Sequence, residues 1–234
     1  MKFDLNFQQK LAVQADDKPL LIVAGAGTGK TRTLTGRLAY LIEKGVPQNR
    51  ILALTFTNKA AKEMAERAAI INSGSGAKGP FIGTFHSLGA RILRVEAKLL
   101  GRNRNFAIFD DSDSLQIIKK LLKAETLRDK ESDYSGAADI SRKISRLKNG
   151  VVSRESVLNS SAEGELIIKL FHHYEKELQK NNAFDFDDLI EKVVHVFKKN
   201  PEVLDKYRKR FRHILVDEYQ DLNNKQYEMI KLLV

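Results

Sequence analysis

Residues 24–31 combine the residue types that a phosphate-binding loop requires. They read Ala-Gly-Ala-Gly-Thr-Gly-Lys-Thr, after an apolar run at Leu20–Val23 and before a helical pattern of leucines. Small residues let consecutive backbone N–H groups point inward, and the next helix adds unpaired donors and the positive end of its dipole. The pattern G-x-x-x-x-G-K-[ST] departs only at its first position. The spacing predicts a strand over 20–24 and a polyphosphate loop formed by Ala24, Gly25, Ala26, Gly27, Thr28, Gly29, Lys30 and Thr31.

Two further elements would complete the chemistry of such a loop. Lys30 is expected to reach the β- and γ-phosphates, and the Thr31 hydroxyl is expected to bind Mg²⁺. Residues 217–221, Asp-Glu-Tyr-Gln-Asp, directly follow the apolar strand pattern of 211–216. Asp217 would hold Mg²⁺ through water, and Glu218 would accept the proton of the attacking water. The sequence therefore predicts a nucleotide site with Mg²⁺.

A glutamine upstream of the loop could select the base. Asn6 is a plausible N-cap of a short helix, with Leu5 packing back onto its first turn. Gln9, in this helix, can donate and accept at once and could read the N6 and N7 edge of adenine. A surface glutamine on a short helix explains the same residue.

Aromatic and hydrogen-bonding residues follow two more apolar strand patterns, at 51–57 and from 81. The first pattern ends in Phe56, Thr57, Asn58 and Lys59, and the second contains Thr84, Phe85 and His86. Ligands of open α/β sheets bind at the carboxyl ends of the strands. Rings and small donors there could stack a nucleic-acid base and hold a phosphate. Core packing explains Phe56 equally well.

The elements that position these residues alternate between strand and helix. Helical patterns are expected directly after the loop, ending near Gly45 and Pro47, and over about 58–69, where Asn58 would be the N-cap. From about residue 88 to 183 helical patterns replace strands, at 111–125, 137–148 and 163–180. A run of this length is far longer than a normal crossover. The prediction is an α/β fold, a parallel sheet flanked by helices at 1–88 and 184–234, with an inserted all-helical subdomain at 89–183.

Composition restricts the partners. The 234 residues include 40 lysines and arginines against 30 aspartates and glutamates, a formal charge of +10, which favours a polyanion such as nucleic acid. The basic cluster at 206–212 is more typical of a solvated helix face. No cysteine is present, so disulfides and thiolate zinc sites are excluded. No apolar run approaches a membrane span or a signal peptide, and a soluble, cytoplasmic protein without membrane contact is expected.

Six motifs in this order resemble those of superfamily 1A DNA helicases, the UvrD, PcrA and Rep group, with Rep as the nearest branch. They are Gln9, the loop at 24–31, Thr55–Ala61, Gly83–Gly89, Phe184–Leu189 and Asp217–Asp221. The resemblance implies a RecA-like P-loop NTPase domain, called 1A, with the helical domain 1B inserted. It also implies 3′ to 5′ translocation on single-stranded DNA and unwinding of duplexes, coupled to ATP hydrolysis. Leu222 departs from the family, in which Thr is common after Asp-Glu-Tyr-Gln-Asp.

The resemblance also assigns roles to particular residues. Lys30, Glu218 and Gln220 match catalytic residues, and Thr31 and Asp217 match metal-binding ones. Gln9 and Arg32 join residues 24–31 as expected contacts of ATP. Phe56, Thr57, Asn58, Lys59, Thr84, Phe85 and His86 fall at or beside positions that hold single-stranded DNA. Expected partners are single strands, junctions with duplex DNA, and proteins of replication or repair; the oligomeric state is open.

The chain ends just past the acidic motif, before the second RecA-like domain that supplies the arginine fingers of this family. An N-terminal helicase fragment that binds nucleotide and DNA weakly, hydrolyses ATP poorly and cannot unwind DNA is therefore expected. Three alternatives remain. A helicase-nuclease subunit of the RecB or AddA kind shares these motifs. A nucleotide-dependent DNA-binding module would not need Glu218. A small-molecule P-loop kinase would not need the aromatic strand ends or the inserted helices.

Overall fold

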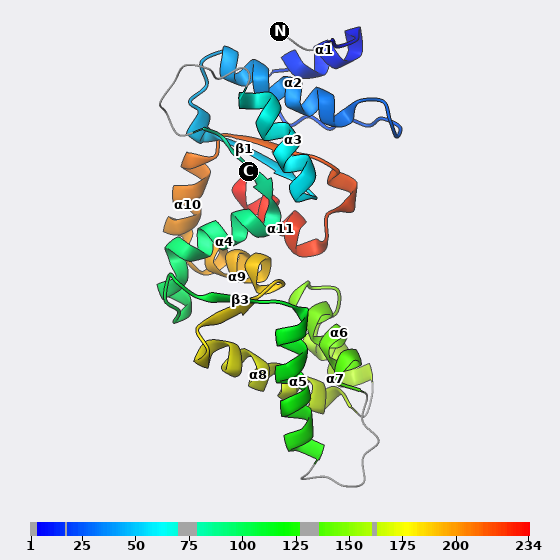
Figure 1. Cartoon of the computed structure of the whole chain (residues 1–234), viewed down its shortest axis with the longest axis vertical. Coiled ribbons are helices and arrows are strands. Elements are labelled where there is room, and N and C mark those ends of the chain that lie inside the picture. The colour runs from blue at the N-terminus through cyan, green and yellow to red at the C-terminus, as the bar shows by residue number, and fades with distance from the viewer. Residues whose placement is uncertain (1–3, 17, 70–78, 127–135, 161–162) are drawn as a thin grey trace. The chain divides into compact units, whose positions relative to one another are not determined.

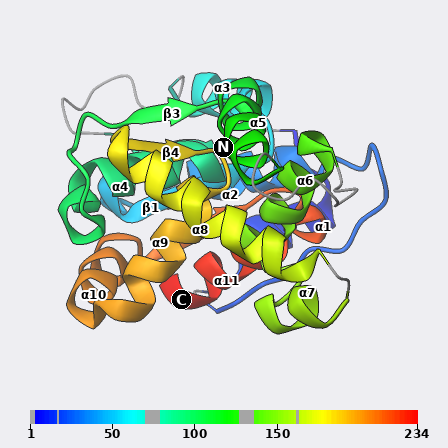
Figure 2. The same ribbon diagram turned by 90° about the horizontal axis from the view of Figure 1, so that it is seen from below.

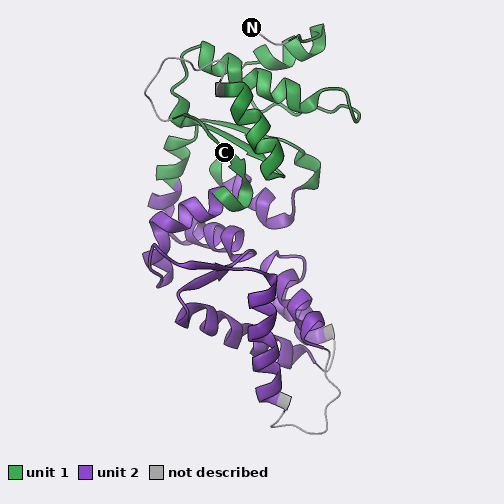
Figure 3. Cartoon of the chain, viewed as in Figure 1, with its two compact units in different colours: residues 1–87, 205–221, 233 green, residues 88–204, 222–232, 234 purple. Residues whose placement is uncertain are grey.

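A computed structural model describes residues 4–16, 18–69, 79–126, 136–160 and 163–234. The chain forms two compact units, coloured separately in Figure 3. Unit 1 comprises residues 1–87, 205–221 and 233, and unit 2 comprises residues 88–204, 222–232 and 234. Unit 2 therefore includes residues 184–204, which the sequence motifs assign to the nucleotide-binding domain. The domain boundaries at 88 and 184 remain a prediction, because compactness and sequence motif divide the chain by different criteria.

Unit 1 is built on a parallel sheet of three strands, β1 (Ile51–Thr55), β2 (Phe81–Thr84) and β5 (His213–Val216). The strand order is β2-β1-β5, so β1 lies in the centre. All five residues of β1 are buried, as expected for a central parallel strand covered on both faces. The register pairs Thr55 with Thr84 and Leu54 with Val216. The residues that follow the three strands therefore all lie at the carboxyl end of the sheet.

Helices of unit 1 cover one face of this sheet (Figure 1). They are α2 (Lys30–Glu43) and α3 (Asn58–Ala69), and α1 (Phe7–Gln14) packs against α2. The short 3₁₀ helix η1 (Gln48–Arg50) precedes β1, and η3 (Tyr219–Asp221) follows β5. Leu38 and Leu41 of α2 pack with Ile51 of β1 and Met64 of α3 in one buried cluster. The helix predicted after the loop is confirmed, and Gly45, with φ of 81°, follows its end.

The predicted strand over 20–24 is wrong. Residues 19–25 have no regular secondary structure, and the side chains of Leu20–Val23 are 37 to 87% exposed. An apolar run indicates a tendency to be buried, whereas a strand also needs a partner for its backbone groups. In the described residues β5 pairs only with β1, so its other edge carries no strand.

Unit 2 is mostly helical. Its elements are η2 (Ala97–Leu100), β3 (Ala107–Phe109), α5 (Asp111–Thr126), α6 (Ala137–Lys148), α7 (Arg154–Ser160), α8 (Gly164–Lys180), β4 (Ala183–Asp185), α9 (Asp188–Lys199) and α11 (Asn224–Leu233). Two more helices, α4 (Phe85–Glu96) and α10 (Pro201–Arg210), each have residues in both units, and the last residue of α11, Leu233, also falls in unit 1. The helices predicted at 111–125, 137–148 and 163–180 are confirmed as α5, α6 and α8.

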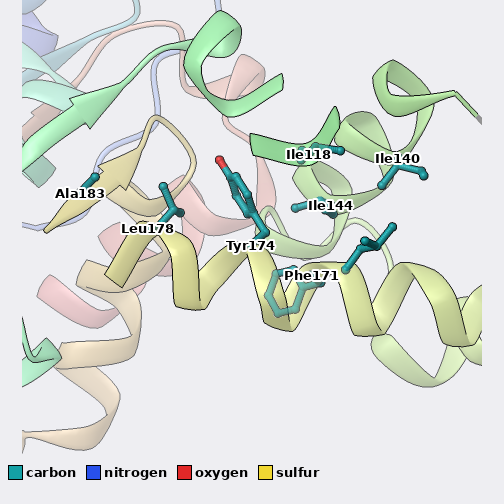
Figure 4. Close-up of a cluster of buried hydrophobic side chains, with 8 residues drawn as sticks. Ile118, Ile140, Ile144, Phe171, Tyr174, Leu178 and Ala183 are labelled. Carbon is teal, nitrogen blue, oxygen red and sulfur yellow. The ribbon is translucent and has the colours of Figure 1, made fainter. Parts of the chain in front are cut away.

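The core of unit 2 joins α5, α6 and α8. Figure 4 shows the buried side chains, which include Ile118, Ile144, Phe171 and Tyr174. The expectation of an insertion without strands needs one correction, because β3 pairs in parallel with β4. Three residues are too few to show a strand period in the sequence. No helix in the described ranges is long and apolar enough to cross a membrane.

Candidate nucleotide-binding site

The loop before α2 has the backbone conformation that its glycines permit. Gly27 and Gly29 have φ of 73° and 90°, in the left-handed region that side chains other than glycine rarely adopt. Thr28 Oγ1 donates to the carbonyl of Gly25 at 2.7 Å and closes the turn. A Cβ atom at Gly29 would lie 2.9 Å from Gln9 Nε2. Gly29 therefore favours glycine through its dihedral angle, and a Cβ atom there would also require the end of the Gln9 side chain to shift.

Lys30 begins α2 and extends back over the loop. Its Nζ donates to the carbonyls of Ala24 and Gly25, each at 3.2 Å. These neutral acceptors are weaker partners for an ammonium than phosphate oxygens are, since hydrogen bonds between charged groups are about twice as strong. The ammonium is thus positioned at the loop and can exchange these carbonyls for a phosphate.

Gln9 braces the same loop from α1. Its Nε2 donates to the carbonyl of Thr28 at 3.0 Å, and its Oε1 accepts from Asn6 N in a capping box with the predicted N-cap. Both ends of the amide are engaged, so reading adenine would require Gln9 to release at least one of these bonds. Arg32 is exposed and donates through Nη1 to the carbonyl of Asp4 at 3.4 Å.

Thr31 and Asp217 meet across the site, although 186 positions separate them. Thr31 Oγ1 donates to Asp217 Oδ2 at 3.1 Å. Burial raises the pKa of the Asp217 carboxyl, the Thr31 hydrogen bond opposes this rise, and the charge of Glu218 adds to it. A hydroxyl and a carboxylate form the oxygen donor set that Mg²⁺ prefers, so these two residues fit the predicted ion.

Glu218 and Gln220 lie beside Asp217 at the end of β5. Glu218 has φ of 47°, uncommon for a residue other than glycine, and its backbone N donates to Asp217 Oδ1 at 3.2 Å. Gln220 Nε2 donates to Glu218 Oε2 at 2.6 Å. Strained backbone at the end of a strand often marks a functional position. At this position the Glu218 carboxylate is in contact with Gln220.

The two aromatic residues predicted to contact DNA differ in exposure. Phe56 follows β1 and is 47% exposed, whereas Phe85 follows β2 and is 1% exposed. A ring stacks on a base only through an open face, so Phe85 is a core residue, and its predicted contact with DNA is not available in this structure. Asn58 and Lys59 are exposed beside Phe56, and His86 is half-buried.

The threonines at these strand ends act on the backbone. Thr57 Oγ1 accepts from the N–H of Ala60, so Thr57 rather than Asn58 caps α3. Thr84 Oγ1 accepts from the N–H of Ser87. Both threonines shape the turns after their strands, and a direct contact with DNA stays a prediction for each.

Sequence reasoning missed an exposed aromatic and a buried charge cluster in unit 2. Phe186 follows β4 and is about half exposed, like Phe56. Lys148, 1% exposed in its side chain, makes ion pairs with Asp185, Asp188 and Glu175 at 2.7 to 2.8 Å. Burial opposes its charge, but the three carboxylates together outweigh burial and raise its pKa. The three aspartates of the 184–189 motif could have indicated a charge cluster, although nothing in the sequence connects them to Lys148.

Three features define a P-loop domain of the RecA-like kind. They are glycines in the left-handed backbone conformation, Lys30 at the start of the helix, and a pair of carboxylates after a parallel strand. The profile described as the UvrD/REP helicase N-terminal domain matches residues 5–234, and the chain belongs to this family. The branch within the family remains a prediction.

Similar curated proteins carry the name ATP-dependent DNA helicase PcrA. The protein from Bacillus subtilis (strain 168) is 46% identical over 232 residues, and that from Staphylococcus epidermidis (strain ATCC 12228 / FDA PCI 1200) is 42% identical over 236 residues. In each case the similarity covers 98% of this chain and 31% of the relative. The chain thus spans about a third of the length of these relatives.

Proposed function

We propose that this chain is the nucleotide-binding motor portion of an ATP-dependent DNA helicase that moves 3′ to 5′ on single-stranded DNA. The observation that supports it most is the contact of Thr31 with Asp217 at the glycine loop, with Glu218 and Gln220 beside it. The relatives named as DNA helicases support the same activity. ATP and Mg²⁺ are the cofactors in this proposal, and the cytoplasm is the proposed location.

The residues of the site divide the work of phosphoryl transfer. When bound, Mg²⁺ would neutralise charge between the β- and γ-phosphates. Lys30 would leave the carbonyls of Ala24 and Gly25 and pair with the phosphates. Thr31 and Asp217 would hold the ion, directly and through water.

The remaining residues would act on the water and on the nucleotide. Glu218 would accept a proton from the attacking water, and Gln220 would orient either that water or the γ-phosphate. The bond from Gln220 to Glu218 would have to be exchanged for this, so it keeps the two side chains adjacent until nucleotide arrives. Gln9 and Arg32 would lie near the base.

Single-stranded DNA is the proposed partner at the carboxyl end of the sheet, where Phe56 follows β1. Its exposed ring could stack a base, and Asn58, Lys59 and the Thr57 turn could hold the adjacent phosphate. His86, after Thr84 on the neighbouring strand, would extend this contact. Junctions with duplex DNA and proteins of replication or repair belong to the same proposal. The domain assignment is residues 1–88 and 184–234 for 1A and 89–183 for 1B.

The experiment measures the binding of nucleotide to this chain. The readout is the fluorescence of a labelled ATP, recorded with and without Mg²⁺ and single-stranded DNA. Lys30→Ala should abolish binding, and Glu218→Gln should retain it while removing ATP hydrolysis. Lys18→Ala, outside the loop, is the matched control. Unchanged binding in Lys30→Ala would refute the site. Hydrolysis that does not depend on Glu218 would refute its role as the acceptor of the water's proton.

A further inference from the structure

Unit 2 contains a cavity of about 290 Å³ whose polar lining is rich in nitrogen donors. Residues of helices α8 and α9, whose ribbons are labelled in Figure 2, contribute to its lining. An ion pair from Lys192 to Glu175 at 2.6 Å joins the two helices. The donor side chains are Arg102, His172, Lys176, Gln179, Lys192 and His195. This volume is just below the range for ligand pockets, about 300 to 1,000 Å³, and suits a small group.

Arg102 is fixed in the wall of this cavity. It is 8% exposed, and its guanidinium lies 5.1 Å from the centroid of the Phe184 ring. Its Nε donates to the carbonyl of Ala183 at 3.2 Å, and Nη1 donates to the carbonyl of Leu100 at 3.3 Å. In the described residues no hydrogen bond engages Nη2. A guanidinium held this way offers a pre-oriented donor to an acceptor inside the cavity.

The exposed donors come from two helices. His172 and Lys176 are four residues apart on α8 and therefore share a face with Gln179, while His195 belongs to α9. Within the part of the chain that the structure describes, Lys176 and the two histidines form no ion pair. These side chains are free to turn toward a ligand without breaking an existing bond.

The one carboxylate of the lining is already compensated. Glu175 directs Oε1 to Lys148 at 2.7 Å and Oε2 to Lys192 at 2.6 Å. Burial would raise its pKa, but Lys148 and Lys192 lower it to about 2, so Glu175 stays ionised and paired. Lys192 is occupied by Glu175 and Glu191, which leaves Arg102 and Lys176 as the cations available to an anion.

We propose that this cavity is a phosphate-binding site, with Arg102 and Lys176 as its charged contacts and His172, Gln179 and His195 as additional donors. A phosphate or diphosphate supplies the several acceptor oxygens that this set of N–H groups would satisfy. The phosphate belongs either to a nucleic-acid backbone or to a free phosphorylated molecule. The first source rests on the proposed function above, and the second does not.

The test uses inorganic pyrophosphate and a single-stranded oligothymidine, each titrated into the full chain by calorimetry. All proteins carry Lys30→Ala, which removes the glycine loop as a competing phosphate site. Lys176→Glu should weaken pyrophosphate binding about tenfold or more, because it replaces a charge-assisted contact with repulsion. Lys180→Glu, on the same helix with a side chain 77% exposed, is the control and should leave binding unchanged. His195→Ala provides a second exposed variant, with a smaller expected loss.

The two probes distinguish the sources of the phosphate. If Lys176→Glu weakens both pyrophosphate and oligothymidine and reduces the salt dependence of DNA binding, the site holds a backbone phosphate. If it weakens pyrophosphate alone, the ligand is a free phosphorylated molecule. The proposal is overturned if pyrophosphate does not bind, or if Lys176→Glu and Lys180→Glu bind it equally. None of these results depends on ATP hydrolysis, so the proposed function can fail separately.

Discussion

Thr31 Oγ1 donates a hydrogen bond to Asp217 Oδ2 at 3.1 Å, which joins the start of α2 to the residue after β5. This bond depends on the parallel register, because Asp217 N also donates to the carbonyl of Leu54 at 2.9 Å. The sheet thus fixes the carboxylate, and the loop fixes the hydroxyl. Two oxygens from distant segments meet where the metal ion of the proposed site would lie.

Asp217→Asn should remove the Mg²⁺-dependent part of nucleotide binding. The amide keeps the size of the side chain but loses its charge, so affinity with Mg²⁺ should fall to the level measured in EDTA. Stability should stay equal or rise, because burial disfavours the charged carboxylate of Asp217. Labelled-nucleotide titrations with and without Mg²⁺ measure the first effect, and thermal unfolding measures the second. Wild-type Mg²⁺ dependence in the variant would exclude Asp217 as a metal-binding residue.

Local patterns were predicted well from the sequence. The N-cap at Asn6, the extent of α2 and the helices α5, α6 and α8 all follow from short-range periodicity and capping. The contact of Thr31 with Asp217 was expected because the order of the motifs placed both residues in one nucleotide site. Each of these signals lies within one element or within a known arrangement of elements.

Other features depend on tertiary contacts that short patterns do not contain. Leu20–Val23 resembles a buried strand but has no partner in this structure. Phe56 and Phe85 occupy equivalent places in the sequence, yet one ring is exposed and the other buried. Lys148 is 37 residues from Asp185, and neither position indicates an ion pair by itself. Pairing, exposure and long-range charge contacts therefore required the structure.

Gly29→Ala should destabilise the chain by about 1 to 3 kcal/mol, because a left-handed dihedral angle and a contact with Gln9 Nε2 both oppose a side chain. Gly27→Ala is the matched control, since Gly27 has the same sign of φ and open space around it. The double variant Gln9→Ala/Gly29→Ala should recover the part of the lost stability that is due to the contact with Gln9. Denaturant unfolding measures all three, and equal losses for both glycines would show that the Gln9 contact is unimportant.

Lys148→Ala should destabilise the fold by about 3 to 5 kcal/mol, because it leaves buried carboxylates without their cation. Lys180→Ala removes a mostly exposed lysine from α8 and should change stability by no more than about 0.5 kcal/mol. Urea unfolding compares the two variants with the wild type. A loss below about 1 kcal/mol for Lys148→Ala would mean that the cluster rearranges or admits water.

Asp188 should make stability fall as the pH rises from about 4 to about 7. Burial raises the pKa of its carboxyl to about 7, Lys148 opposes this rise, and the charge of Asp185 adds to it. In this window the folded chain holds a proton that the unfolded chain has released, so each pH unit removes at most about 1.4 kcal/mol. Glu175 has a lowered pKa, so its stabilising contribution is lost only as the pH falls below about 4.5, at the lower limit of this window.

The measurement is the melting temperature of the wild type and of Asp188→Asn between pH 4.5 and 8. At pH 8 the variant should be less stable because it lacks the charge that pairs with Lys148, and its melting temperature should fall less steeply as the pH rises. Parallel profiles would show that Asp188 is ionised throughout and that its pKa is not raised in the folded chain.

Phe56→Ala and Phe85→Ala should separate binding from stability. Phe56 has an exposed ring, so its loss should weaken single-stranded DNA binding by about 1 to 3 kcal/mol and leave the melting temperature nearly unchanged. Phe85 is buried, so its loss should destabilise the fold by about 3 to 5 kcal/mol. Fluorescence anisotropy with an oligothymidine, below the melting temperature of both variants, measures the binding. If Phe85→Ala weakens DNA binding while Phe56→Ala does not, the ring of Phe85 must leave the core to meet DNA, and the sequence-based assignment of Phe85 is restored.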